Sequence, residues 1–95
     1  MMQLRNFTEE TVRAFLDRLY PTTDICQCEI CRLDVTAIML NGFKPHYVVT
    51  EVGALYAQLE GDFDPQYKVD LMSSMAQAVK LVKERPRHDQ FPPAE

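Results

Sequence analysis

The residues with the clearest chemical potential are three closely spaced cysteines, Cys26, Cys28 and Cys31. A helix that begins near Cys28 places Cys28 and Cys31 on one face, because residues three apart are neighbours on a helix surface. Cys26 precedes the first turn and can fold back toward them. The partial positive charge at a helix N-terminus favours the thiolate form. Since zinc accepts thiolates and binds four ligands in a tetrahedron, the cluster predicts three ligands of a zinc site.

The fourth ligand of this zinc site is not identified by spacing. His46, His88 and Asp34 are candidates within the chain, and water or a second subunit are alternatives. The other interpretation of the cluster is three thiols that bind no metal. Redox catalysis is disfavoured. In a thioredoxin-like fold the Cys-x-x-Cys motif lies near a βαβ pattern, whereas in this chain no strand is expected before Cys28.

Composition limits the classes of partner. The chain has 95 residues, enough for one domain, and a formal net charge of −4. We expect no direct nucleic-acid binding, which depends on phosphate neutralisation by Lys and Arg, although two or three local arginines can still hold a small anion. No apolar run approaches the roughly 18 residues that span a bilayer. The charged N-terminal segment is unlike a signal peptide, so we expect a cytoplasmic protein that contacts no membrane.

The elements that position the cysteines are predicted to be helical. Asn6 or Thr8 caps a first helix that Pro21 stops, because proline lacks the backbone N–H that a helix needs. The second helix runs from near Cys28 to Leu40. It is expected to end at 41–42, where Asn and Gly both tolerate a left-handed backbone.

The second half of the chain is predicted to hold one extended segment and two more helices. Residues 43–49 are extended, since Pro45 disfavours helical geometry before it, but they are too short and isolated to form a sheet. Thr50 caps a short helix that ends at Gly61. Asp64, followed by proline at the first helical position, opens the longest helix. The predicted fold class is therefore all-α, a small bundle of about four helices with one short extended segment.

The longest helix, which reaches about Glu84, has an unusually wide apolar side. It is either the central core helix or part of a homodimer interface as well. Met39, Met72 and Met75 are expected in the core, although methionines also suit an adaptable binding surface. Residues 86–95 follow the helix with few apolar side chains and are expected to be a disordered tail.

Several of these residues together resemble one known family. They are Cys26-x-Cys28-x-x-Cys31-Arg32-x-Asp34-Val35-x-Ala37, then Leu40-Asn41, then Pro45-x-Tyr47-Val48-x-Thr50 and Gly53. In this order and spacing they resemble the late competence development protein ComFB family over roughly residues 7–84. The resemblance implies a ComFB-like domain over residues 1–85.

Membership of that family would carry several expectations. It implies an all-helical homodimer, cysteine-bound zinc in at least some members, and a regulatory role. Cyanobacterial relatives are receptors for cyclic di-GMP. Some relatives have a further cysteine late in the chain, whereas this sequence has none after Cys31. A four-cysteine zinc site within one subunit is therefore impossible here.

A cyclic dinucleotide needs groups for its guanine edges, base faces and phosphates. Arg32 is a candidate for guanine or phosphate, or it pairs with Glu29 or Asp34 on its own helix. Asp34 suits a guanine edge, although bracing Arg32 or capping is the favoured role. Tyr47 is a candidate for base stacking or half-buried packing, and Lys44 for a phosphate contact or a solvated loop. Thr50 is mainly a cap whose helix N-terminus can face a phosphate. Two further arginines are weaker candidates, Arg5 and Arg13.

The leading functional hypothesis is a non-enzymatic receptor for cyclic di-GMP that signals to an unidentified protein partner. The alternative is a zinc-stabilised interaction module, accessory to DNA uptake, with no nucleotide ligand. Enzymatic activity is not expected, because the sequence lacks a nucleophile–base–orienter set, a glycine-rich phosphate loop and a His-Glu-x-x-His motif.

Overall fold

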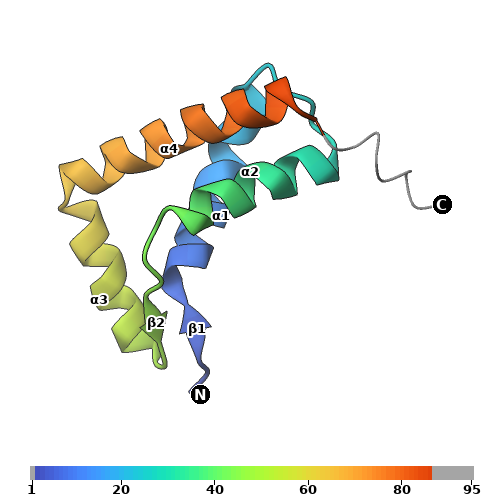
Figure 1. Ribbon diagram of the computed structural model, residues 1–95. Helices are drawn as coiled ribbons and strands as arrows, with labels where there is room; N and C mark the ends of the chain where they lie inside the picture. The colour runs from blue at the N-terminus through green and yellow to red at the C-terminus, as the bar shows by residue number, and fades with distance from the viewer. Residues whose placement is uncertain (1, 87–95) are drawn as a thin grey trace.

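The computed structural model describes residues 2–86 and contains four helices and two very short strands. The all-α fold with one short extended segment is confirmed (Figure 1). The predicted tail lies almost wholly outside the described residues, so the division at residue 85 stays a prediction. In chain order the elements are β1 (Arg5–Asn6), α1 (Phe7–Leu19), the 3-10 turn η1 (Tyr20–Thr22), α2 (Glu29–Asn41), β2 (Tyr47–Val48), α3 (Glu51–Asp62) and α4 (Pro65–Glu84).

Each α-helix begins after a residue whose side chain accepts a hydrogen bond from a backbone N–H of the first turn. Such a cap satisfies one of the N–H groups that have no partner within the helix. Pro65, which lacks an N–H, occupies the first position of α4 as predicted. The four capping residues agree with the starts expected from the sequence: Asn6, Cys28, Thr50 and Asp64.

The first two helices end close to the predicted residues, but not for every reason that was predicted. Helix α1 ends at Leu19, and Pro21 lies inside the 3-10 turn that follows. Helix α2 ends at Asn41 as expected, but Gly42 has φ −94° and is not left-handed. No residue in the described part of the chain has a positive φ. The proposed left-handed ending of α2 is therefore wrong.

The extended segment before α3 forms a small sheet, which corrects the expectation that it would not pair. Strands β1 and β2 are antiparallel, with Arg5 opposite Val48 and Asn6 opposite Tyr47. The side chain of Asn6 also accepts a hydrogen bond from the His46 backbone N–H, at 3.0 Å. The strand partner comes from the chain before α1, far away in the sequence, and local pattern could not reveal it.

The main core lies between α1, η1, α2 and α4, and a second small cluster lies under α3. Figure 1 shows α3 and α4 as two sides of an angle, with the two strands beside the first turns of α3. The second cluster consists of Val48, Ala54 and Ala57, with Phe7 packed against it. Residues that are at most 1% exposed in the main core include Val12, Leu16, Tyr20, Cys31, Val35 and Met39.

Helix α4 packs chiefly against α2 and buries one stripe of its wide apolar side. Leu71, Met75, Ala78 and Val82 are buried there. Met39 and Met75 are core residues as expected, but Met72 is 51% exposed, so its assignment to the core is wrong. None of the helices within residues 2–86 is long and apolar enough to cross a membrane.

Candidate metal centre

The three cysteine sulfur atoms converge on one point. The Sγ atoms of Cys26, Cys28 and Cys31 all lie within 4.8 Å of one another, and none of them is in a disulfide bond. A tetrahedral zinc ion with Zn–S bonds of about 2.3 Å needs sulfur atoms about 3.8 Å apart. A small contraction of the cluster therefore satisfies three of the four positions. The donor set fits zinc, because thiolate sulfur is its preferred ligand in structural sites.

The start of α2 brings two of these sulfurs together. Cys28 is the capping residue, and its Sγ accepts a hydrogen bond from the Cys31 backbone N–H at 3.4 Å. The side chain of Cys31 follows one turn later on the same face. Both thiols thus lie at the positive end of the helix dipole, which favours the thiolate that a metal requires.

The cysteines differ in their access to water. Cys26 is exposed, Cys28 is half-buried and Cys31 is completely buried in the main core. Burial, together with the neighbouring thiols of Cys28 and Cys26, raises the pKa of the Cys31 thiol to about 12. A bound cation acts in the opposite direction, since metal coordination deprotonates a thiol. A bound cation would therefore convert these neutral thiols to thiolates.

Tyr20 positions the loop that carries Cys26. Its hydroxyl donates a hydrogen bond of 2.6 Å to the Cys26 backbone oxygen, and its side chain is completely buried. The side-chain amide of Gln27 donates to the backbone oxygens of Tyr20 and Ile25. Sequence reasoning did not identify Tyr20, whose only visible signal was an aromatic residue just before Pro21.

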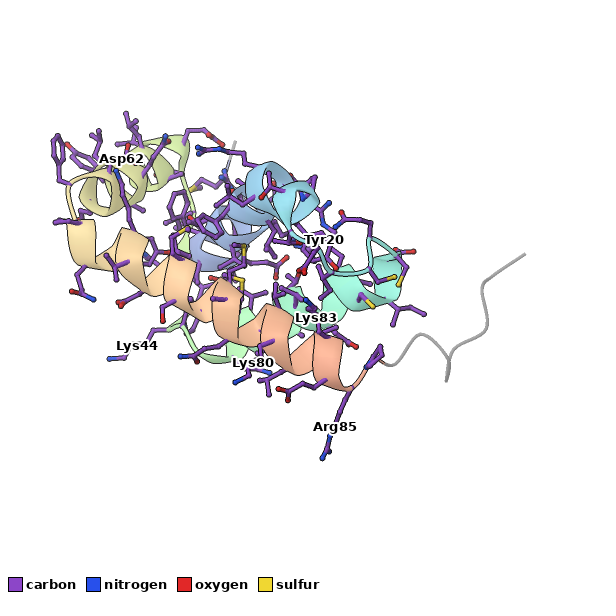
Figure 2. The ribbon with its side chains drawn as sticks, turned by 90° about the horizontal axis from the view of Figure 1, so that it is seen from above. Tyr20, Lys44, Asp62, Lys80, Lys83 and Arg85 are labelled. Atoms are coloured by element: carbon purple, nitrogen blue, oxygen red, sulfur yellow. The ribbon has the colours of Figure 1, made fainter. Side chains whose placement is uncertain are left out.

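The end of α4 lies beside the same loop. The Lys83 ammonium group forms an ion pair of 2.9 Å with the Asp24 carboxylate, two residues before Cys26. This contact holds the pKa of Asp24 below its usual range, through the hydrogen bond from Lys83 and its positive charge. Figure 2 shows Lys83 and Tyr20 toward the same end of the molecule. The loop is therefore flanked by η1 and by the last turns of α4.

Neither described candidate for the fourth ligand joins the cluster. His46 lies next to β2, where its ring meets Phe7 edge-to-face at a centroid distance of 6.3 Å. Asp34 is half-buried on α2 and is not part of the group of converging ligand atoms. His88 lies outside the described residues. Among residues 2–86 the metal-binding group consists of the three cysteines alone.

Arg32 lies near the cysteines, against α1. Its guanidinium forms an ion pair with Asp17 and stands over the Tyr20 ring, 5.7 Å from the ring centroid. A cavity of about 320 Å³ opens between α1 and α2 beside it. The cavity combines two guanidinium groups with two carboxylates, and its lining residues are Arg13, Leu16, Asp17, Glu29, Arg32, Leu33 and Thr36.

The other predicted ligand residues form a separate group. Lys44, Tyr47 and Thr50 lie on the connection between α2 and α3, whereas Arg32 is in the first turn of α2. Arg32 and Asn41 are nine positions apart, which alone separates them by about 13.5 Å along the helix. Figure 2 shows Lys44 far from Tyr20. The five candidates therefore do not line one pocket within a single chain.

The residues of this second group differ in how freely they could contact a ligand. Tyr47 is 61% exposed, so one face of its ring can accept a stacked base. Thr50 is confirmed as the cap of α3, accepting a hydrogen bond from the Gly53 backbone N–H at 3.0 Å. The backbone oxygen of Lys44 accepts a hydrogen bond of 2.8 Å from the Thr8 hydroxyl, which anchors this connection to α1.

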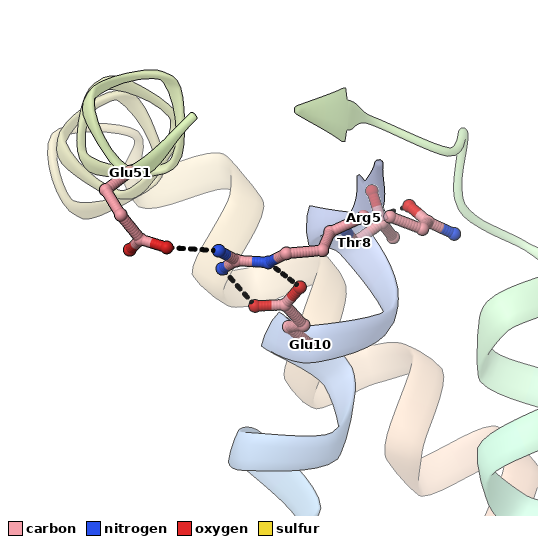
Figure 3. Close-up of polar contacts among 5 residues, drawn as sticks. Arg5, Thr8, Glu10 and Glu51 are labelled. Carbon is pink, nitrogen blue, oxygen red and sulfur yellow. Dashed lines mark hydrogen bonds and ion pairs between the residues drawn. The ribbon is translucent and has the colours of Figure 1, made fainter. Parts of the chain in front are cut away.

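Arg5, a weaker candidate for phosphate binding, is already engaged. Figure 3 shows its guanidinium between the carboxylates of Glu10 and Glu51. The bonds to Glu10 are both 2.7 Å long and the bond to Glu51 is 2.9 Å. Arg5 therefore links β1 to α1 and α3, which is a structural role.

Comparisons with known proteins agree on one family. The family model for late competence development protein ComFB matches residues 5–86. Competence protein ComFB of Bacillus subtilis (strain 168) is 30% identical over 84 residues, which cover 87% of this chain and 85% of that protein. The solved structure of the late competence protein ComFB from Bacillus subtilis is similar, with a TM-score of 0.73 and 29% identity. That similarity covers 88% of this chain and 94% of the other.

Proposed function

Because the chain belongs to the late competence development protein ComFB family, we propose that it is a non-enzymatic regulatory binding protein. In this proposal it holds a zinc ion, acts as a homodimer in the cytoplasm, binds cyclic di-GMP and passes that state to a protein partner. The observation that carries the proposal furthest is the convergence of three cysteine sulfurs at the start of α2.

Zinc would be held by Cys26, Cys28 and Cys31, and when bound it supplies a cross-link between the loop and the helix. The loop joins η1 to α2 and contributes few residues to the core, of which Ile25 is buried. A small domain gains stability from such a metal, because the ion binds the folded chain and not the unfolded one. Metal binding is therefore a structural role in this proposal.

The nucleotide part of the proposal rests on the family resemblance and on the cavity beside Arg32. Arginine is the side chain best suited to bidentate contact with guanine or phosphate, and Arg13 and Arg32 both line this cavity. Its volume of about 320 Å³ is at the lower end of the range for small-molecule sites. A ligand would have to replace the present ion pair between Arg32 and Asp17.

The dimer part is supported by an exposed apolar stripe on α3. Its residues recur at helical spacing, and each is at least 42% exposed. Soluble monomers rarely leave a continuous stripe of this kind in water. A second copy of the chain is the occupant we propose, since a two-fold dimer uses the same patch on both subunits. The stripe consists of Val52, Leu55, Tyr56, Leu59 and the following Phe63.

A binding role, without catalysis and without direct nucleic-acid contact, agrees with the chemistry of the described residues. His46, the imidazole within residues 2–86, contacts the Phe7 ring and is separate from the cysteine cluster. The net charge of −4 opposes attraction to a phosphate backbone.

Calorimetric titration of cyclic di-GMP into zinc-loaded protein tests the receptor proposal. We expect saturable binding, and we expect Arg32→Ala to abolish it. Arg18→Ala is the matched control, because Arg18 is an exposed arginine on the same helix as Asp17 and does not line the cavity. If the unaltered protein shows no binding, the receptor proposal fails and the zinc-stabilised interaction module becomes the better account.

A further inference from the structure

The cysteine cluster places one exposed thiol beside a half-buried one. Cys26 is exposed, Cys28 is half-buried and Cys31 is completely buried, while their Sγ atoms all lie within 4.8 Å of one another. A cysteine that responds to oxidants is accessible to solvent and often has a second cysteine close enough to resolve its oxidised form. Cys26 meets the first condition, and its neighbours meet the second. The cluster therefore has the arrangement of a reversible oxidation site.

The half-buried thiol of Cys28 is better placed than that of Cys31 to react with Cys26. Cα atoms two residues apart are separated by at most about 7 Å, and a disulfide needs about 4.4–6.8 Å. A loop that is bent rather than fully extended therefore brings Cys26 and Cys28 within range. Cys31 belongs to α2 and packs in the main core, where drawing its side chain toward the loop would leave a void.

The loop before α2 allows the two sulfur atoms to approach. Cys26 lies in residues 23–28, which belong to no helix or strand. The hydrogen bond from the Tyr20 hydroxyl holds the Cys26 backbone oxygen and leaves its side chain to turn about the Cα–Cβ bond. The Cys28 Sγ accepts a hydrogen bond of 3.4 Å from the Cys31 backbone N–H. Because sulfur is a weak acceptor, this contact is readily given up for a disulfide bond.

We propose that Cys26 and Cys28 form a reversible oxidation site, at which hydrogen peroxide converts the two thiols to a disulfide. In the first step the Cys26 sulfur attacks one peroxide oxygen, the O–O bond breaks, and a sulfenic acid and one water form. In the second step the Cys28 sulfur attacks the Cys26 sulfur, the S–O bond breaks and a second water leaves. Each sulfur loses one electron, the peroxide gains two, and both thiol protons end in water.

The consequence for the metal rests on the zinc binding proposed above. Thiolate is the form of cysteine that binds a metal, so the disulfide removes two of the three sulfur ligands. The reduced cluster would hold zinc and the oxidised cluster would release it. The oxidation itself requires no metal, so the two proposals can be tested separately.

The test treats the full chain with a small excess of hydrogen peroxide, both zinc-loaded and after removal of metal with a chelator. The intact mass should fall by two hydrogen atoms and return to its original value with dithiothreitol. Trypsin leaves all three cysteines in residues 19–32, so the pair is assigned by alkylating the denatured, oxidised protein, which should label Cys31 alone. The zinc-loaded protein should release one ion for each disulfide, measured with a chromophoric chelator.

Two variants separate the roles of the reacting thiols. Cys28→Ser should stop at the sulfenic acid of Cys26, which dimedone traps, and Cys26→Ser should keep both remaining thiols reduced at the same peroxide concentration. The proposal is refuted if the metal-free protein forms no disulfide, if the disulfide includes Cys31, or if Cys26→Ser oxidises as readily as the unaltered chain. A disulfide between Cys26 and Cys28 in a chain that binds no zinc would support the oxidation site and refute the metal site alone.

Discussion

The substitution Tyr20→Phe isolates the contribution of one hydroxyl to the cysteine loop. The Tyr20 side chain is completely buried, and its hydroxyl donates to the Cys26 backbone oxygen at 2.6 Å. Phenylalanine keeps the ring below the Arg32 guanidinium and removes only this bond. A hydrogen bond of this kind contributes about 0.5–1.5 kcal/mol net. For a domain of this size each kcal/mol lowers the melting temperature by about 4–8 °C.

The assay is thermal and urea unfolding, followed by circular dichroism, with and without added zinc. Tyr47→Phe is the matched control, because its ring is 61% exposed and it should change stability by less than about 0.5 kcal/mol. Zinc affinity should also fall by about ten-fold in Tyr20→Phe, since the backbone at Cys26 loses its anchor. Unfolding and zinc affinity equal to those of the unaltered protein would refute the role assigned to Tyr20.

Three other predictions concern a helix cap, an ion pair and the apolar stripe. Asp64→Ala removes the side chain that caps α4 and should cost about 1 kcal/mol of unfolding free energy in urea titration. Glu10→Gln should destabilise the protein at pH 7 but not in strong acid. The hydrogen bonds from Arg5 hold the pKa of Glu10 below its usual range, so their stabilisation is present above the unfolded pKa of about 4.3 and is lost as the pH falls through the folded pKa. If the stability of Glu10→Gln and that of the unaltered protein differ by the same amount at every pH, this role of Glu10 is contradicted. Leu59→Glu should convert the proposed dimer to a monomer in light scattering, whereas Gln58→Glu, also exposed on α3, should not.

The sequence predicted the helices well because their starts are local. Thr50 and Asp64 are polar residues directly before helical patterns, and each caps the helix expected of it. The strand pair was missed because β1 is a two-residue strand whose partner lies some forty residues later in the chain. Met72 was placed in the core because periodicity marks an apolar side without showing how much of it a neighbour covers. The structure leaves Met72 exposed.

The cysteine cluster was also predictable, since spacing alone brings Cys28 and Cys31 onto one face of a helix. The contacts that position the cluster were not. Tyr20 and Lys83 reach the loop from η1 and from the end of α4, and only the tertiary fold brings them there. Arg32 similarly pairs with Asp17, fifteen residues earlier, where local spacing suggested acids on its own helix.

Zinc analysis of the purified chain, by native mass spectrometry and elemental analysis, tests the central claim most directly. The account predicts one zinc ion per chain, lost in Cys31→Ser and retained in an exposed control such as Ser73→Ala. It also predicts that removing the metal with a chelator makes the exposed Cys26 thiol reactive, while the Cys31 thiol stays buried in the core. A chain that carries no zinc after purification and binds none on titration, with the exposed Cys26 thiol reactive from the start, would contradict the account.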